Sequence, residues 1–425
     1  MKTKKILIIA RDFIPYHPSL GAVIRVIKLS EFLLARGVEV HLIAAKGVEL
    51  DYFGYRPLTE KIHITYVDDF LQTRNTKKKK RAQDKKERLP GNPSPPKALQ
   101  RLLTIIDRSF VPDMGVILAN KYADKAVNVI RQHHIRNVLV SSPPHSTQII
   151  GYLVKMRLKH KISLIAEYRD SWNTLGIYAK TNPLLNRISR VLERKVLQSA
   201  DHFIYHSPPV LEKIKKSLVD IGPKSTLIMN GYDPDMRIEK ASAGRKNACL
   251  TIGYFGAIND ASTGFRNPER FFRVLTRVTF PVKIVFYGYI DISAYWQSLL
   301  GDKIEIHGHI SHKEALEKMM TMDILMLLHS QKQGADEVIP AKIFEYMLVG
   351  KPILAIGPVP MESAKMVNAG KLGYAMDLYH DEDMKHKLIE IYEDWENNRM
   401  PEYDAATCRQ YSRHHQFEKL LPLLQ

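Results

Sequence analysis

Short apolar runs alternate with amphipathic stretches from the start of the chain. Ile6 to Ala10 is wholly apolar, as expected for a buried strand, and Val38 to Ala44 is a second such run. Between them, apolar residues recur at helical spacing from Gly21 to Gly37, where a glycine ends the segment. Since a strand, a crossover helix and a parallel strand form one unit, the pattern predicts a doubly wound sheet that binds ligands beyond the carboxyl ends of its strands.

The alternation continues to the end of the chain and predicts a second domain of the same α/β class. Further strands are predicted at 138–142, 164–166, 200–207, 226–229, 250–256, 282–288, 304–308, 324–328 and 353–356, with helices between them. A polar stretch from Pro234 to Ala248 interrupts the pattern. We therefore expect an N-terminal domain over 1–235, a C-terminal domain over 248–408 and a terminal helix within 409–425. A chain of 425 residues is long enough for two hydrophobic cores.

Charge is distributed unevenly over these two domains. The net charge is +18; residues 1–235 contain 40 Lys and Arg against 21 Asp and Glu, or +19, which leaves −1 for residues 236–425. Nine basic and two acidic residues lie between Arg74 and Arg88, and the Pro-rich stretch Leu89 to Pro96 follows. We expect a flexible basic insertion at about 72–97.

An amphipathic pattern follows this insertion. Its apolar residues are Leu99, Leu102, Leu103, Ile106 and Phe110, and Lys97, Arg101 and Arg108 lie among them. A basic amphipathic helix beside a polybasic loop suits an anionic membrane surface. A solvated loop with an ordinary core-facing helix is an equal alternative. Nucleic acid is not expected as a partner, because the sequence has no aromatic-interleaved basic stripe or recognition motif.

Other composition signals concern location and metals. The first apolar run is too short for a signal peptide, and no run reaches about 18 residues, the length of a membrane span. We expect a cytoplasmic protein, peripheral on the inner face of the cell membrane if the basic insertion binds lipid. Cys249 and Cys408 lie far apart and lack ligand-spaced histidines, so neither a metal site nor a cofactor is predicted.

The most informative stretch runs from Glu337 to Pro352. Pro340 suits a first helical position, and Gly350 is expected to end the helix before an apolar strand. A helix N-terminus with Lys342 in its first turn favours an anion such as a diphosphate. Carboxylates in the helix and in the preceding loop can accept hydrogen bonds from ribose and sugar hydroxyls. The alternative is a capped surface helix with incidental acids.

The pattern Glu-x7-Glu, set in Glu-x-x-Pro-x-Lys-x-x-Glu-Tyr and followed by Gly-Lys-Pro-Ile, resembles the donor site of retaining GT-B glycosyltransferases of group 1, or family 4. The resemblance implies two doubly wound, Rossmann-like domains facing a cleft, with a terminal helix that packs back on the first domain. It implies that Glu345 holds the donor ribose and that Glu337 lies beside the donor sugar. Arg266, just before the first predicted helix of the C-terminal domain, would bind the diphosphate, with Gly256 and Lys342 nearby. The family's usual lysine about five residues after this arginine is missing, and Arg270 or Lys342 is a candidate substitute.

Two further elements resemble the same group. Ser-x-Pro-Pro precedes His145, which becomes a candidate catalytic residue near the reacting carbon of the donor sugar, and Arg-Asp-x-Trp contains Arg169 and Asp170. The glycine loop and helix with Gly21 and Arg25 resemble the acceptor side, to which we also assign Arg169 and Asp170.

These features together predict transfer of a sugar from a nucleoside-diphosphate sugar to a glycan or lipid-linked acceptor, with retention of configuration, in surface polysaccharide assembly. A nucleotide-sugar epimerase of the same fold and a non-catalytic sugar-nucleotide-binding protein are the alternatives. An epimerase would need acids and histidines for proton abstraction, which the sequence does not supply as a set.

Overall fold

The computed structural model describes residues 3–17, 19–50, 55–76, 109–178, 180, 182–236, 247–260, 266–332, 334–403 and 405–425. The chain divides into two compact units. Unit 1 comprises Met1–Ile228 and Phe417–Gln425, and unit 2 comprises Met229–Gln416. The greater part of the predicted basic insertion and amphipathic helix, residues 77–108, lies outside the described residues, as do residues 237–246 of the predicted linker.

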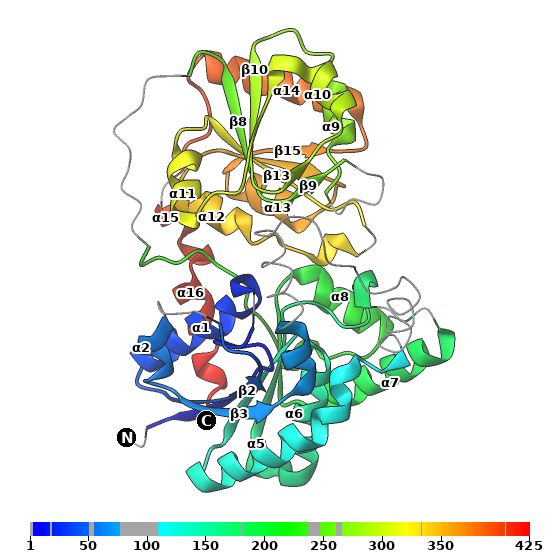
Figure 1. The fold of residues 1–425 in the computed structure, drawn as a ribbon, viewed down its shortest axis with the longest axis vertical. Coiled ribbons are helices and arrows are strands. Elements are labelled where there is room, and N and C mark those ends of the chain that lie inside the picture. The colour runs from blue at the N-terminus through cyan, green and yellow to red at the C-terminus, as the bar shows by residue number, and fades with distance from the viewer. Residues whose placement is uncertain are drawn as a thin grey trace, which may run out of the picture. The chain divides into compact units, whose positions relative to one another are not determined.

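Unit 1 is built on a seven-stranded parallel sheet in the order β3-β2-β1-β4-β5-β6-β7 (Figure 1). The strands are β1 Lys5–Ile9, β2 Glu39–Lys46, β3 His63–Asp68, β4 Asn137–Ser142, β5 Ser163–Tyr168, β6 His202–Tyr205 and β7 Ser225–Leu227. Its helices are α1 Leu20–Ala35, α2 Arg56–Thr59, α5 Ala119–His133, α6 Ser146–Leu158, α7 Pro183–Ser199 and α8 Pro208–Ser217.

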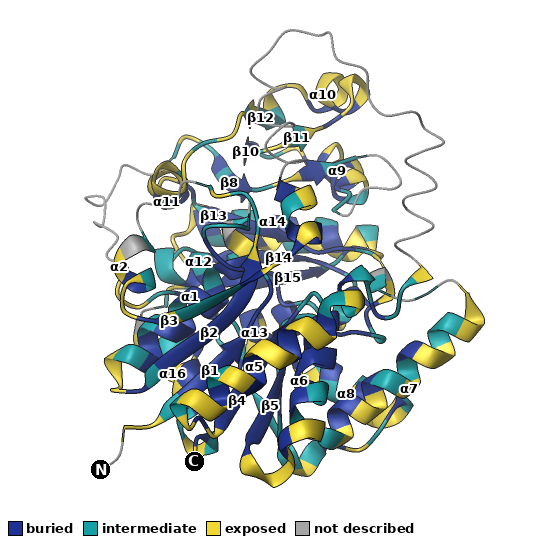
Figure 2. Cartoon of the chain, turned by 60° about the horizontal axis from the view of Figure 1, so that its bottom comes forward, coloured by how far each residue is buried: buried dark blue, intermediate teal, exposed yellow. Residues whose placement is uncertain are grey.

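Apolar residues cover both faces of this sheet because successive strand residues point to opposite sides. Leu7 and Ile9 pack with α5, α6, α7 and α8, whereas Ile6 and Ile8 pack with α1. Figure 2 shows the central strands as buried and the outward faces of α5 and α7 as exposed. The sequence-based expectation of a doubly wound sheet is confirmed.

Unit 2 repeats the architecture with six parallel strands in the order β12-β10-β8-β13-β14-β15. They are β8 Leu250–Phe255, β10 Val282–Tyr287, β12 Ile304–His307, β13 Ile324–Leu328, β14 Ile353–Gly357 and β15 Gly373–Asp377, and β9 Ile258–Asn259 pairs separately with β11 Ile290–Asp291. The helices are α9 Glu269–Leu275, α10 Ala294–Leu300, α11 His312–Met320, α12 Lys342–Val349, α13 Glu362–Ala369, α14 Asp381–Glu396 and α15 Ala405–Cys408. Helix α16, Arg413–Glu418, contains the boundary at which unit 2 ends, Gln416, and unit 1 resumes, Phe417. Helices α9, α10 and α14 pack on one face of the sheet, and α11, α12 and α13 on the other.

Two helix boundaries differ from the sequence-based expectation. Helix α12 begins at Lys342 with Ala341 as its N-cap, so Pro340 precedes the helix instead of opening it; Gly350 ends it in the left-handed conformation, as predicted. The C-terminal segment is a short α16 followed by a 3-10 turn, Leu421–Leu423, instead of one helix. Pro422 explains the break, because proline cannot donate the backbone hydrogen bond that an α-helix interior needs.

Among the helices of the described residues, none combines the length and the apolar character that a membrane span requires.

Both sheets share the feature that positions a site. In each, the strand order reverses direction at the first strand of the unit, between β1 and β4 in unit 1 and between β8 and β13 in unit 2. Loops that leave the carboxyl ends of such a pair diverge to opposite faces and leave room for a ligand. Functional side chains are therefore expected at the carboxyl ends of these two strand pairs.

Candidate active site

In unit 2, Gly256 follows the carboxyl end of β8 with a φ of +148°, which favours glycine. A Cβ atom at this position would lie 2.7 Å from Cε and 3.3 Å from Nζ of Lys342. The glycine thus lets the side chain of Lys342, the first residue of α12, lie directly against the backbone at the end of β8. The predicted donor residues Gly256 and Lys342 are in contact.

Lys342 is a cation in an unfavourable place for its charge. Burial lowers the pKa of its ammonium, the nearby Arg266 guanidinium lowers it further, and Glu345 partly offsets both effects. Within the described residues, the ammonium makes no hydrogen bond and no ion pair shorter than 4 Å. Two cations kept near each other at a strand end suit an anionic ligand.

Glu345 lies one turn further along α12, and its side chain is about one third exposed: Oε1 is 3.6 Å from Nε2 of His312, the first residue of α11. Burial raises the pKa of this carboxyl group, but His312, Lys342 and Arg413 outweigh it, and the pKa is lowered. The ion pair with Glu345 in turn raises the pKa of His312. Glu345 is therefore an ionised acceptor. Sequence spacing could not single out His312, because it lies 33 positions before Glu345.

Glu337 ends a 3-10 turn, Ala335–Glu337, and is fully buried. The loop around it is held by His329, whose Nε2 lies 2.9 Å from the Val338 carbonyl oxygen and whose Nδ1 lies 3.1 Å from that of Ser330. Gly334 begins the turn in the left-handed conformation. The buried His329 was not predicted, and it fixes the backbone on both sides of the turn.

Arg266 and Arg270 flank the start of α9 and have different surroundings. The Arg266 guanidinium acts electrostatically on both Lys342 and the buried Tyr254. The Arg270 guanidinium lies over the Tyr379 ring, 5.0 Å from its centroid. Of the two candidate substitutes for the missing family lysine, Lys342 is therefore the one placed beside Arg266.

In unit 1, His145 follows β4 at the corresponding strand end and is 2% exposed. Its ring stacks on Trp172 with centroids 5.7 Å apart and meets the Tyr178 ring edge-on at 4.7 Å. By hydrogen-bond geometry, neither ring nitrogen has a partner among the described residues. Burial lowers the pKa of His145 to about 4, assisted by Arg169 and opposed by Asp113. The imidazole is therefore neutral at physiological pH.

Arg169 and Asp170 surround this histidine. The Arg169 guanidinium donates to the carbonyl oxygens of Ala22, Ser142 and Pro143 and so joins the loop before His145 to the first turn of α1. Asp170 accepts a hydrogen bond of 3.2 Å from Tyr178, the residue whose ring contacts His145. Arg169 and Asp170, both predicted acceptor residues, thus contact segments that pack against or precede His145.

Arg25 and Gly21, the other two predicted acceptor residues, lie on α1. Arg25 is buried and donates from Nε and Nη2 to Oε1 of Glu167, at 3.0 and 2.8 Å, and to the Ile228 carbonyl. Ser141 donates to the other oxygen of Glu167. Gly21 is exposed in the first turn of α1, and a Cβ there would meet only Ser19 Oγ, at 4.0 Å. Arg25 therefore links α1 to strand β5 and to Ile228 through hydrogen bonds. Gly21, by contrast, leaves space around the first turn of α1.

A second buried cation at this end of the sheet was not predicted. Arg11 follows β1 and contacts Asp69 at 2.6 Å and Ser146 at 3.0 Å, and Tyr122 also donates to Asp69. Gly115 packs so closely that a Cβ would lie 1.7 Å from Arg11 Nη1. Sequence spacing gave no signal for this group, because Arg11 and its partner are 58 residues apart.

Part of unit 2 is similar in sequence to a known family. Residues 283–407 match the family model of group 1 glycosyl transferases. No curated protein matches the chain in sequence.

Solved structures are similar over almost the whole chain. The apo form of the lipopolysaccharide outer core galactosyltransferase WaaB is 12% identical, the match covers 99% of both chains, and the TM-score is 0.64. HepE of Anabaena in complex with UDP is 13% identical, the match covers 98% of both chains, and the TM-score is 0.59. HepE in complex with UDP-glucose is 14% identical, with a TM-score of 0.56; the match covers 99% of this chain and 100% of HepE. A TarM variant of S. aureus with bound UDP is 10% identical, with 99% of both chains covered and a TM-score of 0.57.

At these identities the solved structures establish the fold, and the family model concerns unit 2. Residues 283–407 include Glu337 and α12 with Lys342 and Glu345, whereas Gly256 and Arg266 precede the matched range. The match thus covers part of the predicted donor residues. The match of residues 283–407 to group 1 glycosyl transferases and the GT-B fold of the whole chain together indicate that the protein is a glycosyltransferase.

Proposed function

We propose that the protein transfers a sugar from a nucleoside-diphosphate sugar to a glycan or lipid-linked acceptor, with retention of configuration, in surface polysaccharide assembly. The observation that carries the proposal is the arrangement at the carboxyl end of β8, where Lys342 lies against Gly256 and beside Arg266 while Glu345 remains ionised one turn away. The cations suit a diphosphate, and the carboxylate suits the two hydroxyls of a ribose. Bound UDP and UDP-glucose in the similar HepE structures support a uridine nucleotide as the first donor to test.

Roles for the remaining residues follow from their chemistry. With Lys342 and Arg266 offsetting charge on the diphosphate, the leaving group needs no resident metal in this proposal. Glu337 and the neutral His145 are proposed to contact the sugar, His145 as a hydrogen-bonding group near the reacting carbon. Retention is ascribed to attack from the face that the diphosphate leaves, so that the protein chiefly positions the substrates. Gly21, in the open first turn of α1, remains the proposed acceptor contact, supported by Arg25, Arg169 and Asp170.

Calorimetry with UDP tests the donor site. Glu345→Ala should weaken UDP binding by about 1.5–3 kcal/mol, the usual range for hydrogen bonds to a charged group. Glu317→Ala is a matched control, because Glu317 is an exposed carboxylate on the neighbouring α11 and takes no part in its N-terminal cap. Equal affinities of Glu345→Ala and Glu317→Ala for UDP would contradict the assignment.

Turnover separates the sugar contacts from the nucleotide contacts. Glu337→Gln and His145→Ala should lower transfer while UDP affinity stays near the wild-type value. A parallel loss of both would argue against a role at the sugar.

We also propose that the acceptor lies at an anionic membrane surface and that the first domain binds there through its basic insertion. The support is the charge of +19 in residues 1–235, with +7 between Arg74 and Arg88. Each basic side chain near an anionic bilayer contributes about 1 kcal/mol. Sedimentation should show more protein with anionic than with neutral vesicles, at low salt and not at high salt. Neutralising Lys77 to Arg81 should abolish the difference; equal sedimentation with both vesicle types would contradict the proposal.

A further inference from the structure

Three elements of unit 1 bring histidines and a carboxylate together away from the residues assigned above. Glu39 and His41 are two residues apart on β2 and so point to the same face of the sheet. The register of the parallel pair places His63 of β3 beside His41. His133 is the last residue of α5, a helix that covers this face of the sheet.

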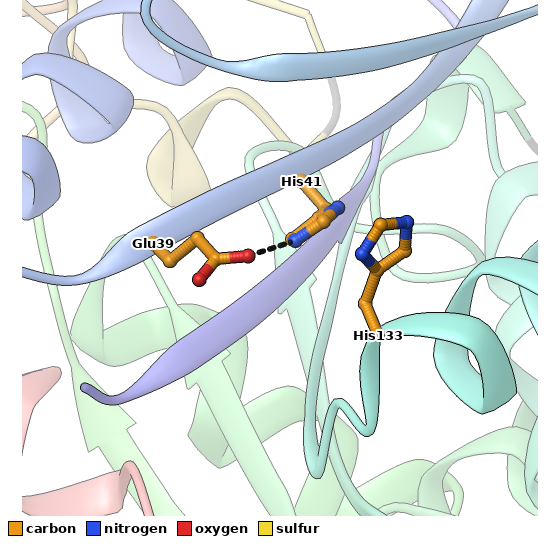
Figure 3. Close-up of side chains that lie close together, drawn as sticks. All are labelled: Glu39, His41 and His133. Atoms are coloured by element: carbon orange, nitrogen blue, oxygen red, sulfur yellow. Dashed lines mark hydrogen bonds and ion pairs between the residues drawn. The ribbon is translucent and has the colours of Figure 1, made fainter. Parts of the chain in front are cut away.

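The distances within this group are short. Glu39 Oε1 lies 2.8 Å from His41 Nε2, and the His41 and His133 ring centroids are 4.4 Å apart. One ligand atom each from Glu39, His41 and His133 lies within 4.8 Å of the others (Figure 3). The His63 ring stacks on His41 at 4.7 Å, with its plane tilted by 24°.

Ordinary structural roles account for only part of this cluster. The hydrogen bond between Glu39 and His41, with Lys5 at 3.2 Å from the second Glu39 oxygen, satisfies those two side chains. It gives no reason for a second imidazole against the first, since two rings that both carried protons would repel each other. A shared metal ion would account for both rings, because each imidazole would bind it in the neutral form.

We propose that Glu39, His41 and His133 form a binding site for one divalent transition-metal ion, with Zn²⁺ as the best match. Two imidazoles and one carboxylate suit Zn²⁺, whereas Mg²⁺ and Ca²⁺ prefer oxygen ligands throughout. Ligand bonds of about 2.0–2.2 Å require the three donor atoms to lie closer together than 4.8 Å. His133, partly exposed at the end of α5, is the ligand whose side chain can turn inward.

The surroundings allow a fourth ligand. A cavity of about 860 Å³ is lined by His41, His63 and His133 together with Tyr16, Tyr55 and Tyr66. Three protein ligands leave one position of a tetrahedral ion open, and this cavity gives water or a small anion access to it. Lys5 contacts Oε2 of Glu39, so a metal ion bound by Oε1 would replace only the hydrogen bond between Oε1 and His41 Nε2.

The site is distinct from the glycosyltransferase residues. Glu39 and His41 lie in the amino-terminal half of β2, whereas Arg11 and His145 follow the carboxyl ends of β1 and β4. An ion here would tie β2 to the end of α5, two segments separated by more than 90 residues of sequence. We therefore assign the metal a stabilising role in unit 1.

The test titrates Zn²⁺ into untagged full-length protein stripped with a chelator and follows the heat by calorimetry. One equivalent should bind, and saturating Zn²⁺ should raise the unfolding midpoint of unit 1 by about 5 °C. His133→Gln should lower the affinity at least tenfold and remove the shift, and Glu39→Gln should do the same. His160→Gln is the matched control, because His160 is exposed in the same unit and outside the cluster.

A spectroscopic measurement tests metal binding without relying on the unfolding midpoint. Co²⁺ in place of Zn²⁺ should give a visible absorption band that disappears in His133→Gln and persists in His160→Gln. Equal unfolding midpoints of wild type and His133→Gln in excess chelator would show that this variant folds. Less than one equivalent of Zn²⁺, or equal binding by wild type and a folded His133→Gln, would overturn the proposal.

Discussion

At the scale of single residues, the cost of charging a side chain decides what it can do. His145 is enclosed by Trp172 and Tyr178, and its pKa is lowered to about 4 because burial removes the water that would solvate an imidazolium. A neutral imidazole can still accept or donate one hydrogen bond to a sugar hydroxyl. Lys342 has a related cost: burial lowers the pKa of its ammonium, and a bound diphosphate would offset its repulsion from Arg266.

The pKa of His145 makes a prediction about stability. Between pH 6.5 and about 4 the unfolded chain binds a proton at this histidine and the folded protein does not, so stability must fall as the pH falls through this window. Each pH unit costs up to about 1.4 kcal/mol. His145→Phe keeps the aromatic packing and removes the titrating group.

Urea unfolding at pH 7 and at pH 4.5 measures the effect. The loss of unfolding free energy between the two pH values should be smaller by about 2 kcal/mol in His145→Phe than in the wild type. His160→Gln, an exposed control in the same unit, should lose as much as the wild type. An unchanged loss in His145→Phe would show that His145 titrates normally in the folded protein.

Residue types and motifs identified Glu337, Glu345, Lys342 and His145 as candidates, but they could not reveal partners. Arg25 and Arg169 were predicted to bind the acceptor. In the structure, Arg25 is paired with Glu167, 142 residues away, and Arg169 with the carbonyls of Ala22, Ser142 and Pro143. A guanidinium is the same in sequence whether it binds a substrate or a backbone carbonyl. Only the fold distinguishes the two.

At the scale of elements, the start of α11 links local sequence to the donor site. The Ser311 side chain accepts from the Glu314 amide, and the Glu314 side chain accepts from the Ser311 amide, as the spacing predicted. His312, the next residue, pairs with Glu345 on α12. The capping box therefore fixes the turn that carries the partner of the proposed ribose ligand.

Ser311→Ala should lower the unfolding free energy of unit 2 by about 1 kcal/mol, because the Glu314 amide loses its acceptor. The chain offers a matched control in Ser293→Ala, since Ser293 is the N-cap of α10 but makes no side-chain capping bond. Urea unfolding should show little change for the control. Similar losses in both variants would mean that the cap contributes nothing specific.

Elements with strong local patterns were predictable, and combinations of elements were not. The run at Ile6 and the amphipathic pattern after Gly21 gave β1 and α1 to within a few residues. Strand β3 was missed, because its sequence HITYVD is short and only Val67 is fully buried. The cluster of His41, His63 and His133 was missed for a different reason, since it depends on the register between β2 and β3 and on where α5 ends.

At the scale of the whole molecule, unit 1 is formed by two separate segments of the chain, Met1–Ile228 and Phe417–Gln425. Phe417, Leu420 and Leu424 belong to the same core cluster as Ile6, Val23 and Ile228. The Phe417 ring lies 5.7 Å from that of Phe32, and the Arg25 guanidinium is 5.5 Å from its centroid. This segment is therefore an integral part of the first core.

Phe417→Ala should lower the unfolding free energy of unit 1 by about 3–5 kcal/mol, since the cavity left by a buried aromatic ring is costly. His415→Ala, an exposed change in the same helix α16, serves as the control and should stay within about 0.5 kcal/mol. UDP binding to unit 2 reports whether the damage is confined to unit 1. A small effect in Phe417→Ala would mean that the segment rests on unit 1 without supporting it.

The return of the chain to unit 1 also sets an order of events during synthesis. The strands of unit 2 are complete once residue 377 has been translated, so its sheet can assemble while the ribosome is still adding residues. Unit 1, although translated first, cannot close its core until Phe417, Leu420 and Leu424 have emerged. During that interval the face of β1, β2 and α1 that these three side chains cover is exposed, and chaperones that bind apolar surfaces would have their longest opportunity there.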